Sequence, residues 1–275
     1  MKARLIVAVI GIPVLFLAIL FLPSWVLGII AGGAAACCAW EFLRCTEEKA
    51  PPRVPAYAAV SAFCIPFLSA FYDRERVLTT VLFLLFAVMF IELLLSFRRP
   101  TTMEFETVAV TLLAGGVIPM LLAGVVRLRL RENAGVAYAL LPFIIAFLSD
   151  SAAFFVGITL GKHKLTPRLS PNKTLEGSIG GFAFCILLVL VYGLVLKLMD
   201  YQINFAVLGV YGFFGSLAAQ VGDLSFSAVK RLYQIKDYGK LLPGHGGMLD
   251  RLDSIIWVVP VLELLVAWVP AFYAP

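Results

Sequence analysis

Runs of about 20 apolar residues recur from one end of this 275-residue chain to the other, and each is long enough to cross a bilayer core of about 30 Å. Backbone N–H and C=O groups cannot stay unpaired in lipid, so such runs must form helices or a closed barrel, and unbroken apolar runs favour helices. We therefore expect an all-α, polytopic membrane bundle. About nine spans are predicted, at residues 5–22, 26–43, 54–72, 77–97, 108–126, 135–160, 178–199, 205–226 and 255–273.

Composition agrees with a bilayer as the solvent. Apolar residue types make up 61% of the chain and charged types 14%, whereas about a quarter of an ordinary soluble domain is charged. No stretch is left for a soluble domain, so residues 1–275 are expected to form one membrane domain whose signature-bearing half spans about 134–275. The N-terminal apolar run continues through Phe21 without a small-residue cleavage site, which favours a retained helix over a signal peptide.

The net charge of +5 is carried by basic clusters between the spans. Anionic lipid headgroups and nucleotides would meet these clusters, so membrane lipids and phosphates are expected partners and nucleic acid is not. The clusters alternate sides consistently if the N-terminus is cytoplasmic. Arg127, Arg129 and Arg131 fall on the outer side of this topology, which requires either a miscounted span or snorkelling to an interface.

Some carboxylates, among them Glu41, Glu92 and Asp150, lie inside apolar runs, where an ionisable group is costly unless it is paired. Glu41 and Glu92 lie near span ends beside Arg44 and Arg98, which favours salt bridges at the helix edges. Asp150 lies deep in an apolar run and must find a partner or a cavity. It is therefore a functional candidate.

The segment from Ser227 to Asp253 packs cations, carboxylates and glycines more densely than a lipid-facing helix would tolerate. Glycines around a central histidine would let backbone N–H groups approach phosphate oxygens, and the cations would offset phosphate charge. A solvated loop with ordinary salt bridges is the alternative. The candidate binding residues here are Lys230, Arg231, Lys236, Asp237, His245, Gly246, Gly247 and Arg251.

Carboxylates within and just before this segment indicate a metal site. Asp250 and Asp253 are three residues apart and share one face if the chain is helical there, while Asp223 ends the preceding span. Mg²⁺ takes oxygen ligands and bridges to substrate phosphates, so carboxylates among cations favour magnesium.

A second polar segment, residues 161–177, has the features of a phosphate-binding turn. Pro171 and Asn172 favour a turn, and Lys173 is a point charge for phosphate. Thr174 offers a hydroxyl and a helix N-cap near Ser178. Ser170, Asn172 and Thr174 are candidate binding residues. The Gly-x-x-x-x-Gly-Lys pattern of a P-loop is absent from the sequence. Positive-inside anchoring is the alternative role for the cations of this segment, and His163 is more typical of a loop histidine than of a ligand.

These residues resemble a known family. The stretch from Ser227 to Asp253 resembles the signature of phosphatidate cytidylyltransferases, and Ser170–Gly177 and Asp150 are similar to further family sequences. The resemblance covers roughly the C-terminal half. It implies a reaction of CTP with phosphatidate that gives CDP-diacylglycerol and pyrophosphate, at a magnesium-dependent site facing the cytoplasm from the inner (plasma) membrane.

The resemblance also implies roles for single residues. Asp223 and Asp250 would be metal ligands, with one or two metal ions, while Asp253 and Asp150 would support them. The phosphate-binding residues would be Lys173, Lys230, Arg231 and Arg251. A homodimer is compatible with the resemblance. The chain departs from the family at residues 151–154, where Ser-Ala-Ala-Phe stands in place of a glycine and a tyrosine, so a tyrosine hydroxyl's role does not carry over.

Two other functions compete with this hypothesis. A CTP-dependent polyprenol kinase would use similar groups to phosphorylate a lipid alcohol, but an alcohol needs a base, whereas a phosphate monoester is already an anionic nucleophile that needs positioning and charge neutralisation. A transporter could line a path with Asp150 and the basic loops, yet matching broken spans in two halves are not evident in the sequence.

The topology gives a first prediction. Two expected spans separate residues 161–177 from residues 227–254, so both loops should face the cytoplasm and Asp200 should face the opposite side. Single cysteines placed at each position, in a variant without the native cysteines, should show this pattern with an impermeant thiol reagent. Labelling of the two loops from opposite faces would contradict both the topology and a shared site.

Overall fold

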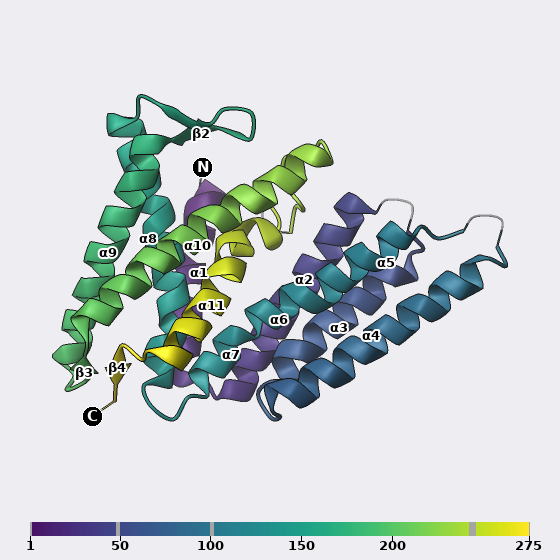
Figure 1. Ribbon diagram of the computed structural model, residues 1–275, viewed down its shortest axis with the longest axis horizontal. Coiled ribbons are helices and arrows are strands. Elements are labelled where there is room, and N and C mark those ends of the chain that lie inside the picture. Colours follow the sequence, from purple (N-terminus) through teal and green to yellow (C-terminus); the bar gives the residue numbers. More distant parts are fainter. Residues whose placement is uncertain (1, 48–49, 100–101, 242–245, 275) are drawn as a thin grey trace. The chain divides into compact units, whose positions relative to one another are not determined.

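The computed structural model describes residues 2–47, 50–99, 102–241 and 246–274, and these are mainly helical (Figure 1). The helices are α1 (Lys2–Phe21), α2 (Ser24–Thr46), α3 (Arg53–Leu68), α4 (Arg74–Ser96), α5 (Phe105–Leu112), the π-helical turn η1 (Leu113–Val117), α6 (Ile118–Leu122), α7 (Gly124–Arg129), α8 (Gly135–Leu160), α9 (Leu175–Lys197), α10 (Phe205–Leu232) and α11 (Leu249–Trp268). Two short antiparallel pairs complete the described structure: β1 (Lys164–Thr166) with β2 (Ser170–Thr174), and β3 (Gln202–Ile203) with β4 (Phe272–Tyr273).

The all-α membrane architecture is confirmed, and each expected apolar run coincides with a helical segment. Among the described residues, 6 helical segments are long and apolar enough to cross a membrane, so the count of about nine is not confirmed. The 6 segments are Ser24–Thr46, Arg74–Ser96, Phe105–Arg129, Gly135–Leu160, Leu175–Lys197 and Phe205–Leu232.

The span at Phe105–Arg129 is interrupted by η1. Pro119 has no N–H to donate to the carbonyl of Gly115, four residues earlier, and its ring crowds that carbonyl. The Ser61 hydroxyl of α3 donates to the Gly115 carbonyl oxygen at 2.8 Å. A wider π turn is therefore tolerated inside an apolar segment because a neighbouring helix satisfies the backbone group that Pro119 leaves.

The chain divides into two compact units, residues 1–130 with 235–251, and residues 131–234 with 252–275. The expectation of a single catalytic domain over residues 1–275 stays a prediction.

In the first unit, α2 packs along α3, and α3 packs against α4. Glu92 of α4 is buried and forms salt bridges with two arginines. Its Oε2 lies 2.8 Å from the Arg53 guanidinium and 3.6 Å from the Arg99 guanidinium. A salt bridge was the correct expectation, but the predicted partner Arg98 was wrong. The start of α3 brings Arg53 to the end of α4, a contact between distant parts of the chain that neighbouring residues alone could not indicate.

The three arginines that conflict with the simple topology donate to backbone carbonyl groups. Arg127 donates to the Met120 carbonyl at 3.1 Å and Arg129 to the Ile19 carbonyl of α1 at 3.0 Å, both within the first unit. In the second unit, Arg131 donates to Val266 near the end of α11 at 3.3 Å. Arg129 and Arg131 thus meet carbonyl groups in the last turns of α1 and α11, which lack intrahelical partners and attract cations.

In the second unit, α8, α9 and α10 pack against one another (Figure 1). The β1–β2 hairpin joins α8 to α9 at one end, and Arg231 near the end of α10 donates to the Leu169 carbonyl of the hairpin at 3.3 Å. Asp200 lies at the other end, between α9 and β3. The hairpin and the end of α10 thus share one end of the unit, as the expected topology requires, while the membrane side stays a prediction.

Close packing of α2 on α3 gives a second prediction. A Cβ on Gly32 would lie 2.7 Å from the Phe63 carbonyl oxygen, whereas a Cβ on the adjacent Gly33 would meet nothing within 4 Å. Gly32→Ala should therefore lower the Tm of the detergent-purified protein, because overpacking costs about 1–3 kcal/mol and exceeds the gain of about 1 kcal/mol in helix propensity. Gly33→Ala is the matched control and should leave the Tm unchanged or higher. Equal loss in both variants would contradict the packing.

Candidate active site

The ion pair between Lys173 and Asp223 connects the polar segment 161–177 with the end of the span that precedes the second polar segment. Lys173 lies in β2 and Asp223 in α10, and the Lys173 Nζ is 2.5 Å from the Asp223 Oδ2. Both side chains are about 30% exposed, so solutes can reach them. Ser227, one turn further along α10, donates to the Asp223 Oδ1 at 3.3 Å. The structure thus brings Lys173 and Asp223 together. The two side chains form a salt bridge, as the alternative hypothesis of ordinary salt bridges predicts.

The position of Lys173 is fixed by the hairpin and by the start of α9. The strands pair Lys164 with Thr174 and Thr166 with Ser170. Thr174 is the N-cap of α9, as predicted, because its hydroxyl accepts the Gly177 N–H at 3.1 Å. The other candidates of this segment, Ser170 and Asn172, lie in β2 with Lys173.

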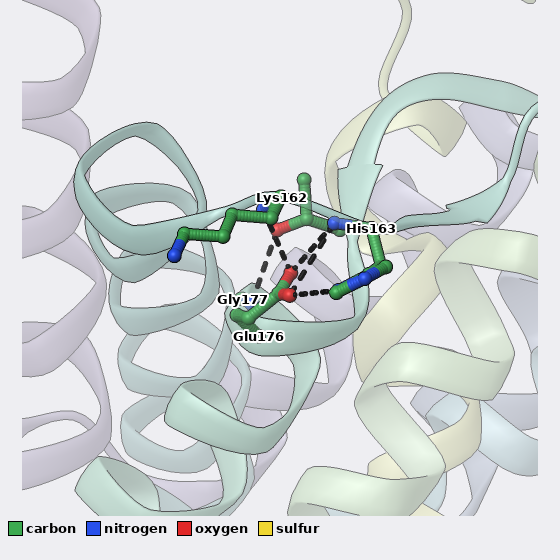
Figure 2. Close-up of polar contacts among 5 residues, drawn as sticks. Lys162, His163, Glu176 and Gly177 are labelled. Atoms are coloured by element: carbon green, nitrogen blue, oxygen red, sulfur yellow. Dashed lines mark hydrogen bonds and ion pairs between the residues drawn. The ribbon is translucent and has the colours of Figure 1, made fainter.

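Glu176 in the first turn of α9 closes the base of the hairpin. Its carboxylate accepts the backbone N–H of Lys162 at 3.0 Å and of His163 at 3.1 Å, and it lies 2.6 Å from the His163 Nδ1 (Figure 2). The Lys162 side chain extends away from this carboxylate in Figure 2. His163 is thus a loop histidine with a carboxylate partner. Glu176 was not among the predicted site residues, although an acidic residue in a first helical turn after Lys173 was the available signal.

A carboxylate cluster lies next to this ion pair in the second unit. Asp253 of α11 is 7% exposed, and its Oδ1 accepts the Ser254 N–H at 2.8 Å. Burial raises the pKa of the Asp253 carboxyl to about 7, the negative charge of Asp223 adds to the rise, and the buried Lys230 opposes it. A buried carboxyl beside a second carboxylate favours an added cation.

Asp150 of α8 also belongs to this cluster. Its Oδ2 accepts a hydrogen bond from the Ser254 hydroxyl at 3.3 Å, and its charge acts on Asp253. The predicted partner for this intramembrane carboxylate thus exists. A contact between Asp150 and Ser254 was not predicted from the sequence. The only indication in the sequence was that Ser254 is adjacent to Asp253. The second unit therefore gathers Asp150, Asp223, Asp253, Lys173 and Lys230.

The remaining signature residues belong to the first unit. The Asp250 Oδ2 accepts the N–H groups of Tyr238 at 2.9 Å and Gly247 at 3.0 Å. Gly246 has φ +88°, a backbone conformation that favours glycine. Lys236, Asp237 and Arg251 are exposed. His245 lies outside the described residues.

Glu41 has a different role from the one predicted. Instead of a helix-edge salt bridge with Arg44, its carboxylate accepts the N–H groups of Met248 at 3.1 Å and Leu249 at 3.0 Å. The Arg44 guanidinium lies over the Trp40 ring, 4.8 Å from its centroid. The sequence could not indicate this partnership, because the two segments are 207 residues apart.

Two glycines of the signature owe their identity to Glu41. A Cβ on Gly239 or on Gly247 would overlap the Glu41 carboxylate. The absence of a Cβ at these two positions therefore leaves room for the Glu41 carboxylate.

Metal ligation by Asp223 and Asp250 is not tested by this geometry. In the part of the chain that the structure describes, no group of three His, Cys, Asp or Glu residues forms a metal-binding arrangement. Asp223 and Asp250 also fall in different compact units.

A family model and a known protein match nearly the whole of this chain. A model of the cytidylyltransferase family matches residues 2–269. The phosphatidate cytidylyltransferase of Bacillus subtilis is 35% identical over 272 residues, which are 97% of this chain and 98% of that protein. Proteins of the same name from Staphylococcus aureus (strain COL) and Staphylococcus haemolyticus are 45% and 44% identical over 134 and 131 residues, about half of each chain. The similarity therefore includes the N-terminal half, which the signature alone did not cover.

Proposed function

The chain belongs to the cytidylyltransferase family, and on this premise we propose that it transfers CMP from CTP to phosphatidate, giving CDP-diacylglycerol and pyrophosphate for phospholipid biosynthesis. The match along nearly the full length of the Bacillus subtilis phosphatidate cytidylyltransferase carries the proposal. The charged cluster of the second unit supports it, because a nucleotidyltransferase must hold several phosphate groups.

The cluster has the chemistry that this transfer needs. The phosphate oxygen of phosphatidate attacks the α-phosphorus of CTP, the bond from that phosphorus to the β-phosphate oxygen breaks, and pyrophosphate leaves with the electron pair. Both reactants are anions, so binding and orientation by cations matter more than a base. Lys173 suits this role because it is accessible and its present partner, Asp223, is a carboxylate that an incoming phosphate can replace.

Magnesium fits the donor set of the cluster. Asp150, Asp223 and Asp253 carry carboxylate oxygens, the donor type that Mg²⁺ takes, and the charges of Asp150 and Asp223 act on the buried Asp253. We assign Asp223 and Asp250 as the ligands from the family resemblance, with one or two metal ions. A bound Mg²⁺ would neutralise triphosphate charge.

The remaining assignments concern location and partners. We propose that α1, α3 and the part of α11 from residue 255 onward also cross the bilayer, which gives nine spans in the bacterial inner (plasma) membrane. The positive loops would then place the polar segments in the cytoplasm, where CTP is available. The partners are CTP, phosphatidate and membrane lipids, without nucleic acid, and a homodimer is the proposed assembly.

Label transfer tests the function. Purified protein with phosphatidate and CTP labelled at either the α- or the γ-phosphate should move the α-label into lipid and leave the γ-label in pyrophosphate. Lipid carrying the γ-label would identify a lipid kinase instead. Unchanged CTP with the correct lipid present would favour the transporter hypothesis.

Substitutions in the cluster test the metal assignment. Asp223→Asn and Asp250→Asn should each lower turnover about 100-fold or more, because an amide keeps the shape but loses the charge that holds a cation. Lys173→Ala should raise KM for CTP or lower turnover while the magnesium requirement remains. Asp200→Asn is the matched control, since it lies at the other end of the unit with φ 66°, which asparagine tolerates. Near-normal turnover with an unchanged magnesium requirement in both aspartate variants would contradict metal ligation and indicate that Asp223 and Asp250 form salt bridges instead.

A further inference from the structure

A carboxylate on α2 holds the start of α11 within the first unit. Glu41 is 8% exposed, and both of its oxygens are used: Oε1 accepts the Met248 N–H and Oε2 accepts the Leu249 N–H. A buried carboxylate in an apolar helix is costly unless donors meet it, and here two backbone donors do so.

The start of α11 needs such an acceptor. The first N–H groups of a helix have no intrahelical partner, and a local Ser, Thr, Asp or Asn side chain usually accepts one of them. Met248, which precedes the first helical residue Leu249, has no side-chain oxygen. Glu41 supplies the acceptor from another helix, and its negative charge also suits the positive end of the helix dipole.

The surrounding chain is fitted to this contact. Gly239 and Gly247 lack the Cβ that would overlap the Glu41 carboxylate. Further along α2, the Cys45 thiol donates to the Tyr238 carbonyl at 2.9 Å, and the Phe42 and Tyr238 rings lie 5.8 Å apart. One face of α2 therefore holds both ends of the segment from Tyr238 to Leu249.

Asp250 directly follows Leu249 in the chain. Its Oδ2 accepts the Tyr238 and Gly247 N–H groups, so its orientation depends on the same segment that Glu41 anchors. We propose that Glu41 is a positioning residue, which fixes the first turn of α11 and thereby the carboxylate of Asp250. The consequence for turnover rests on the proposed function, whereas the anchoring contact does not.

The experiment uses the full-length protein with Glu41→Gln and Glu41→Ala. Hydrogen–deuterium exchange of residues 246–252 should be about 10-fold faster in Glu41→Ala, the effect of losing one charged hydrogen bond, and intermediate in Glu41→Gln, which keeps one acceptor. The kcat should fall about 10-fold or more in Glu41→Ala, with partial recovery in Glu41→Gln, while KM for CTP stays within about twofold. Glu47→Gln is the matched control, because Glu47 directly follows α2 and its carboxylate accepts from the Thr107 hydroxyl instead.

Gly247→Ala separates positioning from general destabilisation. Its Cβ should displace Glu41 in the parent protein, yet it should add little in the Glu41→Ala background, where the carboxylate is gone, so the two effects on kcat should be non-additive. Additive losses, or unchanged exchange in Glu41→Ala, would overturn the anchoring contact. Faster exchange with unchanged kcat would overturn the positioning role. A parent protein that transfers no CMP would refute the proposed function, and exchange would still decide whether Glu41 anchors α11.

Discussion

A carboxylate removed from water is costly unless it forms an ion pair or accepts hydrogen bonds from backbone N–H groups, and both units contain such contacts. Glu92 pairs with two arginines, and the Glu41 carboxylate accepts hydrogen bonds from two backbone N–H groups. Asp223 pairs with Lys173. The first two contacts hold helices in place. The third is partly exposed and lies beside further carboxylates, which is why we propose this ion pair, and not the two scaffold contacts, as the place where a substrate phosphate binds.

The proposed chemistry follows from this difference in exposure. A fully enclosed ion pair would resist a substrate phosphate, whereas the Lys173–Asp223 pair is partly exposed, and in the proposed reaction a phosphate replaces Asp223 at Lys173. Lys230 and Asp253 are buried, and the charges of Lys230 and Asp223 act on the Asp253 carboxyl. A reaction between two anions needs this combination of a fixed electrostatic background and a movable contact.

The apolar runs predicted the helical segments because length and hydropathy fix a membrane helix almost independently of its neighbours. The motif around Lys173 and the N-cap at Thr174 were also predictable, since capping is local. Contacts between distant segments were not. Glu41 was assigned to Arg44 and Glu92 to Arg98 because only neighbours in the sequence could be considered, and the interruption at η1 depends on Ser61 of another helix.

Short strands flank helix α9 of the second unit along the chain. Lipid cannot satisfy the outer-edge backbone groups of an exposed hairpin such as β1–β2, so this hairpin is expected in water or at the headgroups. In the β3–β4 pair, the Phe272 N–H and C=O instead both bond the Tyr138 hydroxyl. Helix α9 lies between β2 and β3 along the chain and has 23 residues, about 35 Å of helix at 1.5 Å per residue. That length slightly exceeds a hydrocarbon core of about 30 Å. Helix α9 can therefore shift only a little along the bilayer normal before polar residues at one of its ends enter the hydrocarbon core.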